Sequence, residues 1–200
     1  MTHEPQRRHV HTRSIRIDAY ARDDGLWDIE AILIDTKSRD LQLASGSRAA
    51  GDPVHEMKLR VTIDTDLNVR DAQADTSWVP YPGYCNQIEP AYKQLVGLNL
   101  ARDFRRHVRE RLGGSRGCTH LTELAAVMPT AAIQAFAGEA IPRPPKHAKA
   151  QTERKPFQLD RCHALVTTGP AVAKFYPRWF RSAECGAPEA QSNTEHGETR

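Results

Sequence analysis

The stretch TRSIRIDAYARDDGLWDIEAILID, Thr12–Asp35, decides the fold that we predict for this chain. Its first part alternates strictly and places Ile15 and Ile17 on one face, and its second part is an apolar run bounded by turn-forming residues. The Asp24–Gly25 pair between the two parts is a strong signal for a tight hairpin turn. The stretch therefore predicts two antiparallel strands.

A second pair of strands follows in VHEMKLRVTIDTDLNVRDAQADT, Val54–Thr76, with Asp-Thr-Asp as its turn. After residue 80 the apolar period becomes helical, which predicts two helical segments over residues 84–112, with a break at Gly97, and a third over 118–141. Strands that precede helices in this way are typical of α+β folds. We predict a four-stranded antiparallel sheet of two hairpins, with about three helices packed on one face and a C-terminal docking segment.

The composition is that of a soluble globular protein of 200 residues. No apolar run approaches the roughly 18 residues needed to cross a bilayer, and the basic N-terminus lacks the apolar segment of a secretory signal. We therefore expect a cytoplasmic protein whose four cysteines are thiols, ligands or core residues rather than disulfides. The net charge is only +3, and the densest basic segment, Arg102–Leu112, has the spacing of a solvated helix face, so we expect no nucleic-acid partner.

The domain organisation follows from shifts in composition along the chain. We predict a flexible N-terminus over residues 1–12, a single α+β domain over 13–183 and a disordered polar tail over 184–200. Within the domain, the proline- and charge-rich stretch at 142–156 is typical of a connector. After it, Thr168 as N-cap and Pro170 near the first helical position predict a last helical turn.

The stretch GGSRGCTHLTEL, Gly113–Leu124, places Cys118 at the predicted start of a helix and His120 two residues later. A helix N-terminus has unpaired N–H groups and the positive end of the helix dipole, and both stabilise a thiolate. Cys118 is therefore a candidate nucleophile or ligand, and His120 a candidate proton-transfer group or ligand. The structural alternative is that Cys118 packs as a small apolar residue while Thr119 caps the helix.

Cys85 also precedes a predicted helix, so it and Cys118 can form a pair of soft metal ligands. Zinc or iron would need two further nitrogen or oxygen donors, and the available ones are His55, Asp23, Asp24 and His163. The spacing is not that of a metal motif such as CxxC or HExxH. The candidate metal ligands are Cys85, Cys118, His120 and His55, with zinc or iron as the metals that suit them.

The first hairpin turn carries paired carboxylates beside an arginine. Asp23 and Asp24 can supply a general base, and Arg22 can hold an anionic group. The alternative is that Asp-Asp-Gly serves ordinary turn chemistry.

His55 shares a strand face with Met57, opposite Glu56. If this face is the core, His55 is a buried imidazole that needs a polar partner. Such an imidazole is either a satisfied structural group or a proton-transfer group, and the pattern leaves both open.

The C-terminal segment CHALVTTGPAVAKFYPRWF, residues 162–180, gathers aromatic side chains beside basic ones. Tyr176 and Arg178 can line a pocket for a flat anionic ligand. The alternative is that the aromatic residues dock this segment on the core.

Several segments, taken in order, resemble a bacterial family labelled domain of unknown function 2889. They are ARDDGLWDIEAILID, VHEMKLRVTID, the YC before a helix, LVGLNLARDF, GCTHL, CHAL and YPRWF, and they span about residues 13–180. The resemblance implies that the family's motif positions include Asp23, Asp24, Gly25, His55, Met57, Cys85, Gly117, Cys118, His120, Cys162 and His163. It implies a role for none of them.

The expected architecture is also similar to that of iron–sulphur cluster scaffold proteins, whose ligands come from one hairpin loop and two helix starts. This likeness implies comparable places for Asp24, Cys85, Cys118 and His120. The hairpin loop of this chain lacks the cysteine that those scaffolds carry there.

Together these candidates lead us to expect a small-molecule enzyme. Lyase or isomerase chemistry suits them, with proton abstraction beside an electron-withdrawing group and a cation or metal that stabilises the oxyanion. The expected catalytic residues are His55, His120, Asp24 and Cys118, and the expected ligands of an anionic or phenolic substrate are Arg22, Tyr176 and Arg178.

Two other classes of function remain open. One is a non-catalytic metal- or iron–sulphur-binding module that delivers its cargo to a partner, and the other is a domain that only binds partners. The chain has no GxSxG elbow, glycine-rich phosphate loop or dinucleotide fingerprint, so we expect neither a serine hydrolase nor a nucleotide cofactor.

Overall fold

The computed structural model describes residues 5–137, 155–156 and 158–182. The chain divides into two compact units, residues 1–143 and 144–200, where a single domain over 13–183 is predicted from the sequence. The division falls within the proline-rich stretch predicted as a connector. Residues 1–4 of the predicted flexible N-terminus, residues 142–154 of the connector and the whole predicted tail over 184–200 lie outside the described residues.

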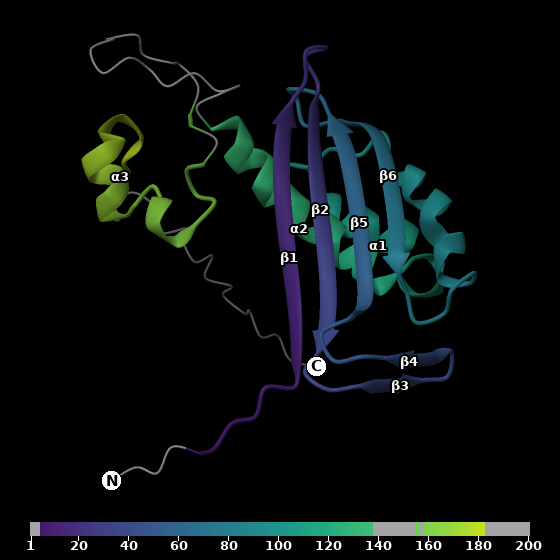
Figure 1. Cartoon of the computed structure of the whole chain (residues 1–200). Helices are drawn as coiled ribbons and strands as arrows, with labels where there is room; N and C mark the ends of the chain where they lie inside the picture. The colour runs from purple at the N-terminus through teal and green to yellow at the C-terminus, as the bar shows by residue number, and fades with distance from the viewer. Residues whose placement is uncertain (1–4, 138–154, 157, 183–200) are drawn as a thin grey trace, which may run out of the picture. The chain divides into compact units, whose positions relative to one another are not determined.

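The first unit contains a four-stranded antiparallel sheet (Figure 1). Its strands, in spatial order, are β1 (His11–Ala21), β2 (Trp27–Lys37), β5 (Pro53–Ile63) and β6 (Val69–Trp78). The two predicted hairpins are therefore confirmed. A further short hairpin, β3 (Leu41–Leu43) with β4 (Gly46–Arg48), lies in the stretch between them. Its strands are too short for the alternation of side chains to indicate them.

Helices cover one face of this sheet, and Figure 1 shows α1 and α2 behind the strands. In chain order the helices are η1 (Cys85–Leu95), α1 (Phe104–Leu112), η2 (Gly114–Arg116) and α2 (Thr119–Phe136). Helix α2 packs across β1, β2 and β5, while η1 packs against β6. The predicted α+β class with about three helices is confirmed. The first segment, η1, is a 3₁₀ helix with Pro90 inside it, a residue that lacks the N–H required in the interior of an α-helix.

The core lies between the sheet and these helices. Ile29 and Leu33 of β2 and Leu59 and Val61 of β5 are at most 1% exposed, because odd-numbered side chains of both strands point toward the helices. Asp35 continues this series on β2, and His55 begins it on β5. Two polar side chains are therefore carried to the helix-covered face at one end of the sheet.

The second unit contains the short helices η3 (His163–Leu165), α3 (Pro170–Phe175) and η4 (Pro177–Trp179). Pro170 is the first residue of α3, as predicted, and the N-cap is Gly169 rather than Thr168. The hydroxyl of Thr167 and its backbone N–H both donate to Asp160, so a side-chain carboxylate orders the chain just before the helix. Docking of this segment on the core stays a prediction. Among the helices of the described residues, none is long and apolar enough to cross a membrane.

Candidate functional site

Asp35, His55 and His120 form a compact cluster, which we call the His–Asp cluster. They come from β2, β5 and α2, and one potential metal-ligating atom of each lies within 4.8 Å of those of the other two. Nδ1 of His55 is 3.2 Å from Oδ2 of Asp35, and Nε2 of His120 is 3.5 Å from the same oxygen. Within the part of the chain that the structure describes, no other three His, Cys, Asp or Glu side chains come this close.

Strand pairing and a helix start bring these three residues together. Asp35 and His55 are direct partners in the antiparallel β2–β5 ladder, where opposite Cβ atoms are about 4.5–5.5 Å apart. The ladder shifts register between Asp35 and Thr36, so the cluster lies where regular pairing ends. His120 is in the first turn of α2, which crosses this end of the sheet.

Arg13 of β1 fixes the carboxylate of Asp35. Its Nε and Nη2 donate to Oδ1 and Oδ2 at 2.8 Å each, and its Nη1 donates to Glu123 of α2 at 2.5 Å. Nε2 of His11 lies 3.3 Å from Oδ1 of Asp35. The Asp35 side chain is only 4% exposed. Burial acts to raise the pKa of Asp35, but Arg13, His55 and His11 outweigh it and lower the pKa below its usual value, so Asp35 is ionised at neutral pH.

The two imidazoles of the cluster lie against each other, with ring centroids 3.9 Å apart and planes tilted by 32°. Their side chains are 18% and 20% exposed for His55 and His120. Burial lowers the pKa of both histidines. His120 adds to this shift for His55, and Arg13 adds to it for His120. Asp35 opposes the shift in both cases. Both rings are therefore neutral near pH 7, the form in which histidine binds metals or accepts protons.

One buried nitrogen of the cluster has no hydrogen-bond partner among the residues that the structure describes. Nδ1 of His55 is buried, and although it lies close to Oδ2 of Asp35, the alignment of the two groups is not that of a hydrogen bond. Buried polar atoms without a partner are uncommon in folded proteins and call for a specific reason. A bound cation is one such reason, since it would take the lone pair of this nitrogen.

Cys118 borders the cluster at the start of α2. Its Sγ is 3.7 Å from Nδ1 of His120, and it is the N-cap residue of the helix. The hydroxyl of the fully buried Tyr92 donates to the carbonyl of Cys118 at 2.9 Å and accepts its N–H at 3.0 Å. Tyr92 thereby fixes the helix start that carries His120.

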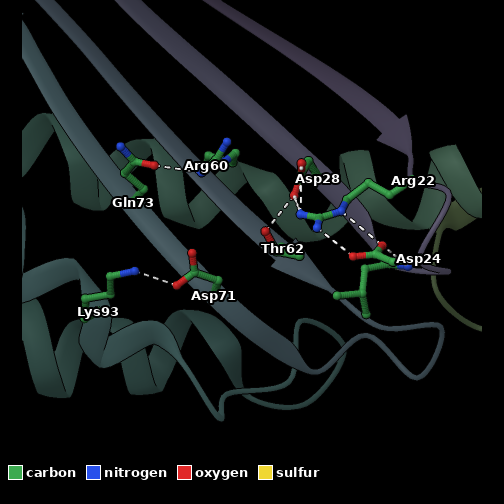
Figure 2. A network of polar contacts seen from close by, with 9 residues as sticks. Arg22, Asp24, Asp28, Arg60, Thr62, Asp71, Gln73 and Lys93 are labelled. Atoms are coloured by element: carbon green, nitrogen blue, oxygen red, sulfur yellow. Dashed lines mark hydrogen bonds and ion pairs between the residues drawn. The ribbon is translucent and has the colours of Figure 1, made fainter.

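The structure does not bring Asp24 or Arg22 to the histidines. They lie in the β1–β2 turn, and β2 separates this turn from Asp35 by about 25 Å, at about 3.3 Å per residue. Figure 2 shows Arg22 between Asp24 and Asp28, with donor–acceptor distances of 2.6 Å and 3.3 Å. Thr62 donates to Asp28 at 2.6 Å. The same view contains the pairs Arg60–Gln73 and Lys93–Asp71.

The other predicted residues are also elsewhere. Cys85 begins η1 and packs, partly buried, against the hydrophobic core. The structure therefore does not bring the two predicted thiols and two predicted imidazoles together as one ligand set. The third residue beside His55 and His120 is Asp35. Tyr176 and Arg178 belong to the second unit. There the hydroxyl of Tyr176 accepts a hydrogen bond from Gln158, and the guanidinium of Arg178 lies 5.3 Å from the ring centroid of Trp179. A substrate-binding role for these two residues stays a prediction.

Two shallow surface hollows lie apart from the cluster. One lies over Lys58 and Arg60 on the sheet face opposite the helices, and the other beside Arg105 and Arg109 of α1. Neither is lined by a cluster residue. The His–Asp cluster and these two surface hollows are therefore separate features of the first unit.

The sequence contains a signal for Asp35 that our prediction did not use. Ile29, Ala31 and Leu33 occupy alternate positions of an apolar face, and Asp35 is the next residue on that face. A carboxylate that continues a buried face needs a partner, and this requirement indicates a functional or structural polar centre. For Arg13, Glu123 and His11 no comparable local pattern exists.

Residues 11–134 match the model of a family described as "Protein of unknown function (DUF2889)". The chain belongs to this family. The DUF2889 match includes all three cluster residues as well as Arg13, and it ends before the segments CHAL and YPRWF. No curated protein and no solved structure matches the chain. The likeness to iron–sulphur scaffold proteins stays a prediction.

Proposed function

We propose that this DUF2889 protein is a small-molecule enzyme in which the His–Asp cluster holds one divalent cation, zinc or ferrous iron. The observation that carries the proposal is the buried nitrogen of His55, which has no hydrogen-bond partner in the described part of the chain and faces the carboxylate of Asp35. The reaction class is proton transfer of the lyase or isomerase type, on an anionic or phenolic substrate.

The donor set and its spacing support a single cation. Two imidazoles and one carboxylate are a frequent ligand set for catalytic zinc and for ferrous iron. Ligand bonds of about 2.0–2.2 Å put neighbouring donor atoms about 3.0–3.5 Å apart. Two of the three donor pairs fit this range, since the donors of His55 and His120 lie 3.2 Å and 3.5 Å from Oδ2 of Asp35, and all three donor atoms lie within 4.8 Å of one another.

The surroundings of the cluster resemble the supporting contacts of metal centres. Metal-binding carboxylates and imidazoles generally carry a second hydrogen bond that orients them. Arg13 supplies this contact to Asp35, and Cys118 lies beside the remaining nitrogen of His120. Because the cluster has three protein ligands rather than four, a coordination position remains for water or substrate, as catalytic sites require.

Such a cation supports proton abstraction beside a carbonyl group. A divalent cation held by Asp35, His55 and His120 would lower the pKa of water at its open position and would stabilise negative charge on the carbonyl oxygen of a substrate. Return of the proton to another carbon gives an isomerase, and loss of a neighbouring leaving group gives a lyase.

The first test is metal binding by the full-length protein. After removal of metal with a chelator, titration calorimetry with zinc should give one site per chain, which His55→Ala, His120→Ala or Asp35→Ala abolishes. His107→Ala and Cys85→Ala are the matched controls, because His107 pairs with Glu110 on α1 and Cys85 lies outside the cluster. Zinc binding that survives all three cluster substitutions contradicts the proposal.

The second test addresses catalysis. The metal-loaded protein is incubated in D₂O with a panel of keto acids and hydroxyaryl carbonyl compounds, and deuterium incorporation at carbon is followed by NMR. We expect exchange into at least one compound, and its loss in His55→Ala. One bound cation without exchange into any compound favours the alternative function, a module that delivers its metal to a partner.

A further inference from the structure

Arg13 has hydrogen-bonding capacity that no other described residue uses. A guanidinium carries five N–H donors, and Arg13 engages three of them, two with Asp35 and one with Glu123. The two remaining donors are on the terminal nitrogens, Nη1 and Nη2. The side chain is 34% exposed, so a ligand from solvent can reach it.

The charge of the centre also favours an anion. Two carboxylates, those of Asp35 and Glu123, and one guanidinium, that of Arg13, lie at the centre, so a divalent cation leaves one positive charge in excess. The proposed cation would lie between side chains that are 4–20% exposed, where water compensates its charge poorly. A neutral ligand leaves the excess in place, whereas a monoanion removes it.

A carboxylate combines the required charge with a geometry that arginine recognises. Its two oxygens lie in one plane and can be shared between a cation and a guanidinium N–H. Arg13 already binds the carboxylate of Asp35 and so lies directly beside one of the proposed cation ligands.

We propose that the His–Asp cluster binds small carboxylates, with one oxygen on the cation and the other accepting a hydrogen bond from Arg13. This inference rests on the cation proposed above. It makes Arg13, rather than Arg22 or Arg178, the residue that selects an anionic substrate.

Cobalt provides a direct test, because the visible spectrum of Co²⁺ responds to a change of its ligands. The protein is loaded with Co²⁺ and titrated with benzoate or with the neutral analogue benzamide. We expect benzoate to change the cobalt spectrum and benzamide not to do so. Arg13→Gln should weaken benzoate binding by about tenfold or more while cobalt still binds. If Arg13→Gln folds poorly, Arg13→Lys serves as the second variant. It keeps the positive charge, and we expect it to retain part of the affinity for benzoate.

Arg22→Gln is the matched control, because Arg22 is on the same hairpin but at its opposite end, and it should bind benzoate as the wild type does. The inference is overturned if cobalt binds and benzoate leaves its spectrum unchanged, or if Arg13→Gln binds benzoate as tightly as the wild type. Failure to take up cobalt at all contradicts the proposed cation itself, and the carboxylate site with it.

Discussion

The two ends of the β1–β2 hairpin each pair an arginine with an aspartate, but their surroundings differ. At the turn, the side chains of Arg22 and Asp24 are 38% and 44% exposed, and their hydrogen bonds are made within the network of Figure 2. At the other end, the carboxylate bound by Arg13 is buried. The first pair therefore competes with water, whereas the second is shielded from it.

Histidine distinguishes the two ends further. Three imidazoles, those of His11, His55 and His120, face the single carboxylate of Asp35. The network at the turn contains none. An Arg–Asp pair by itself therefore indicates little about function, while several nitrogen donors around one buried carboxylate indicate a site.

The largest expected difference between the two ends concerns stability. Asp35→Asn should lower the free energy of unfolding by about 2–4 kcal/mol, because it leaves the charge of Arg13 without its buried partner. Asp24→Asn should change it far less, since solvent replaces the lost contact. Urea unfolding of both variants measures the contrast, and equal losses would show that burial does not distinguish the two ends.

The next effect is stabilisation by metal. Zinc at about 100 times its Kd should raise the free energy of unfolding of the wild type by about 2.7 kcal/mol. His55→Ala should lose this gain, and Asp24→Asn should keep it. Unfolding in zinc and in chelator gives the measurement, and a gain that persists in His55→Ala would place the cation elsewhere.

A smaller effect separates stability from metal affinity. Tyr92→Phe and Thr62→Val each remove one buried hydroxyl and should each cost about 1–2 kcal/mol of unfolding free energy. Only Tyr92→Phe should also weaken zinc binding, by up to about tenfold, because Tyr92 fixes the helix start that carries His120. Thr62 binds Asp28 at the opposite end. If calorimetry shows that both substitutions weaken zinc binding to the same extent, this assignment is wrong.

The smallest effect is a pH dependence at the turn. Hydrogen bonds from Arg22, followed by that from the N–H of Leu26, lower the pKa of Asp24. The contribution of ionised Asp24 to the free energy of unfolding is therefore complete at pH values above its unfolded pKa of about 3.9. It is lost as the pH falls through the lower pKa of the folded state. The amide shift of Leu26, followed by NMR, should titrate with a midpoint below about 3.9, and Arg22→Gln should raise that midpoint. An unchanged midpoint in the variant would show that Arg22 does not cause the shift.

Those parts of the fold that depend on local periodicity could be predicted from the sequence. Alternation indicates both long hairpins, and helical spacing indicates α1 and α2. The short hairpin of β3 and β4 within residues 38–52 could not be predicted, because strands of three residues have no measurable period. The 3₁₀ geometry of η1 depends on Pro90 and on packing against β6, which the apolar pattern does not specify.

The candidate site was predictable only in part. His55 and His120 have local signals, an apolar strand face and a helix start, and the structure brings them together. Asp35 becomes recognisable only when β2 and β5 are paired, since the pairing places it opposite His55. Cys85 illustrates the reverse case, because a cysteine before a helix suits core packing as well as metal binding.

The ion pair between Arg13 and Glu123 joins residues that are 110 positions apart. A nascent chain that has released only its first hairpin from the ribosome presents Asp35 with Arg13 but with neither His55 nor His120. The cluster is complete only after α2 has emerged and folded onto the sheet. The proposed cation can therefore find all three of its ligands only after most of the first unit has been translated.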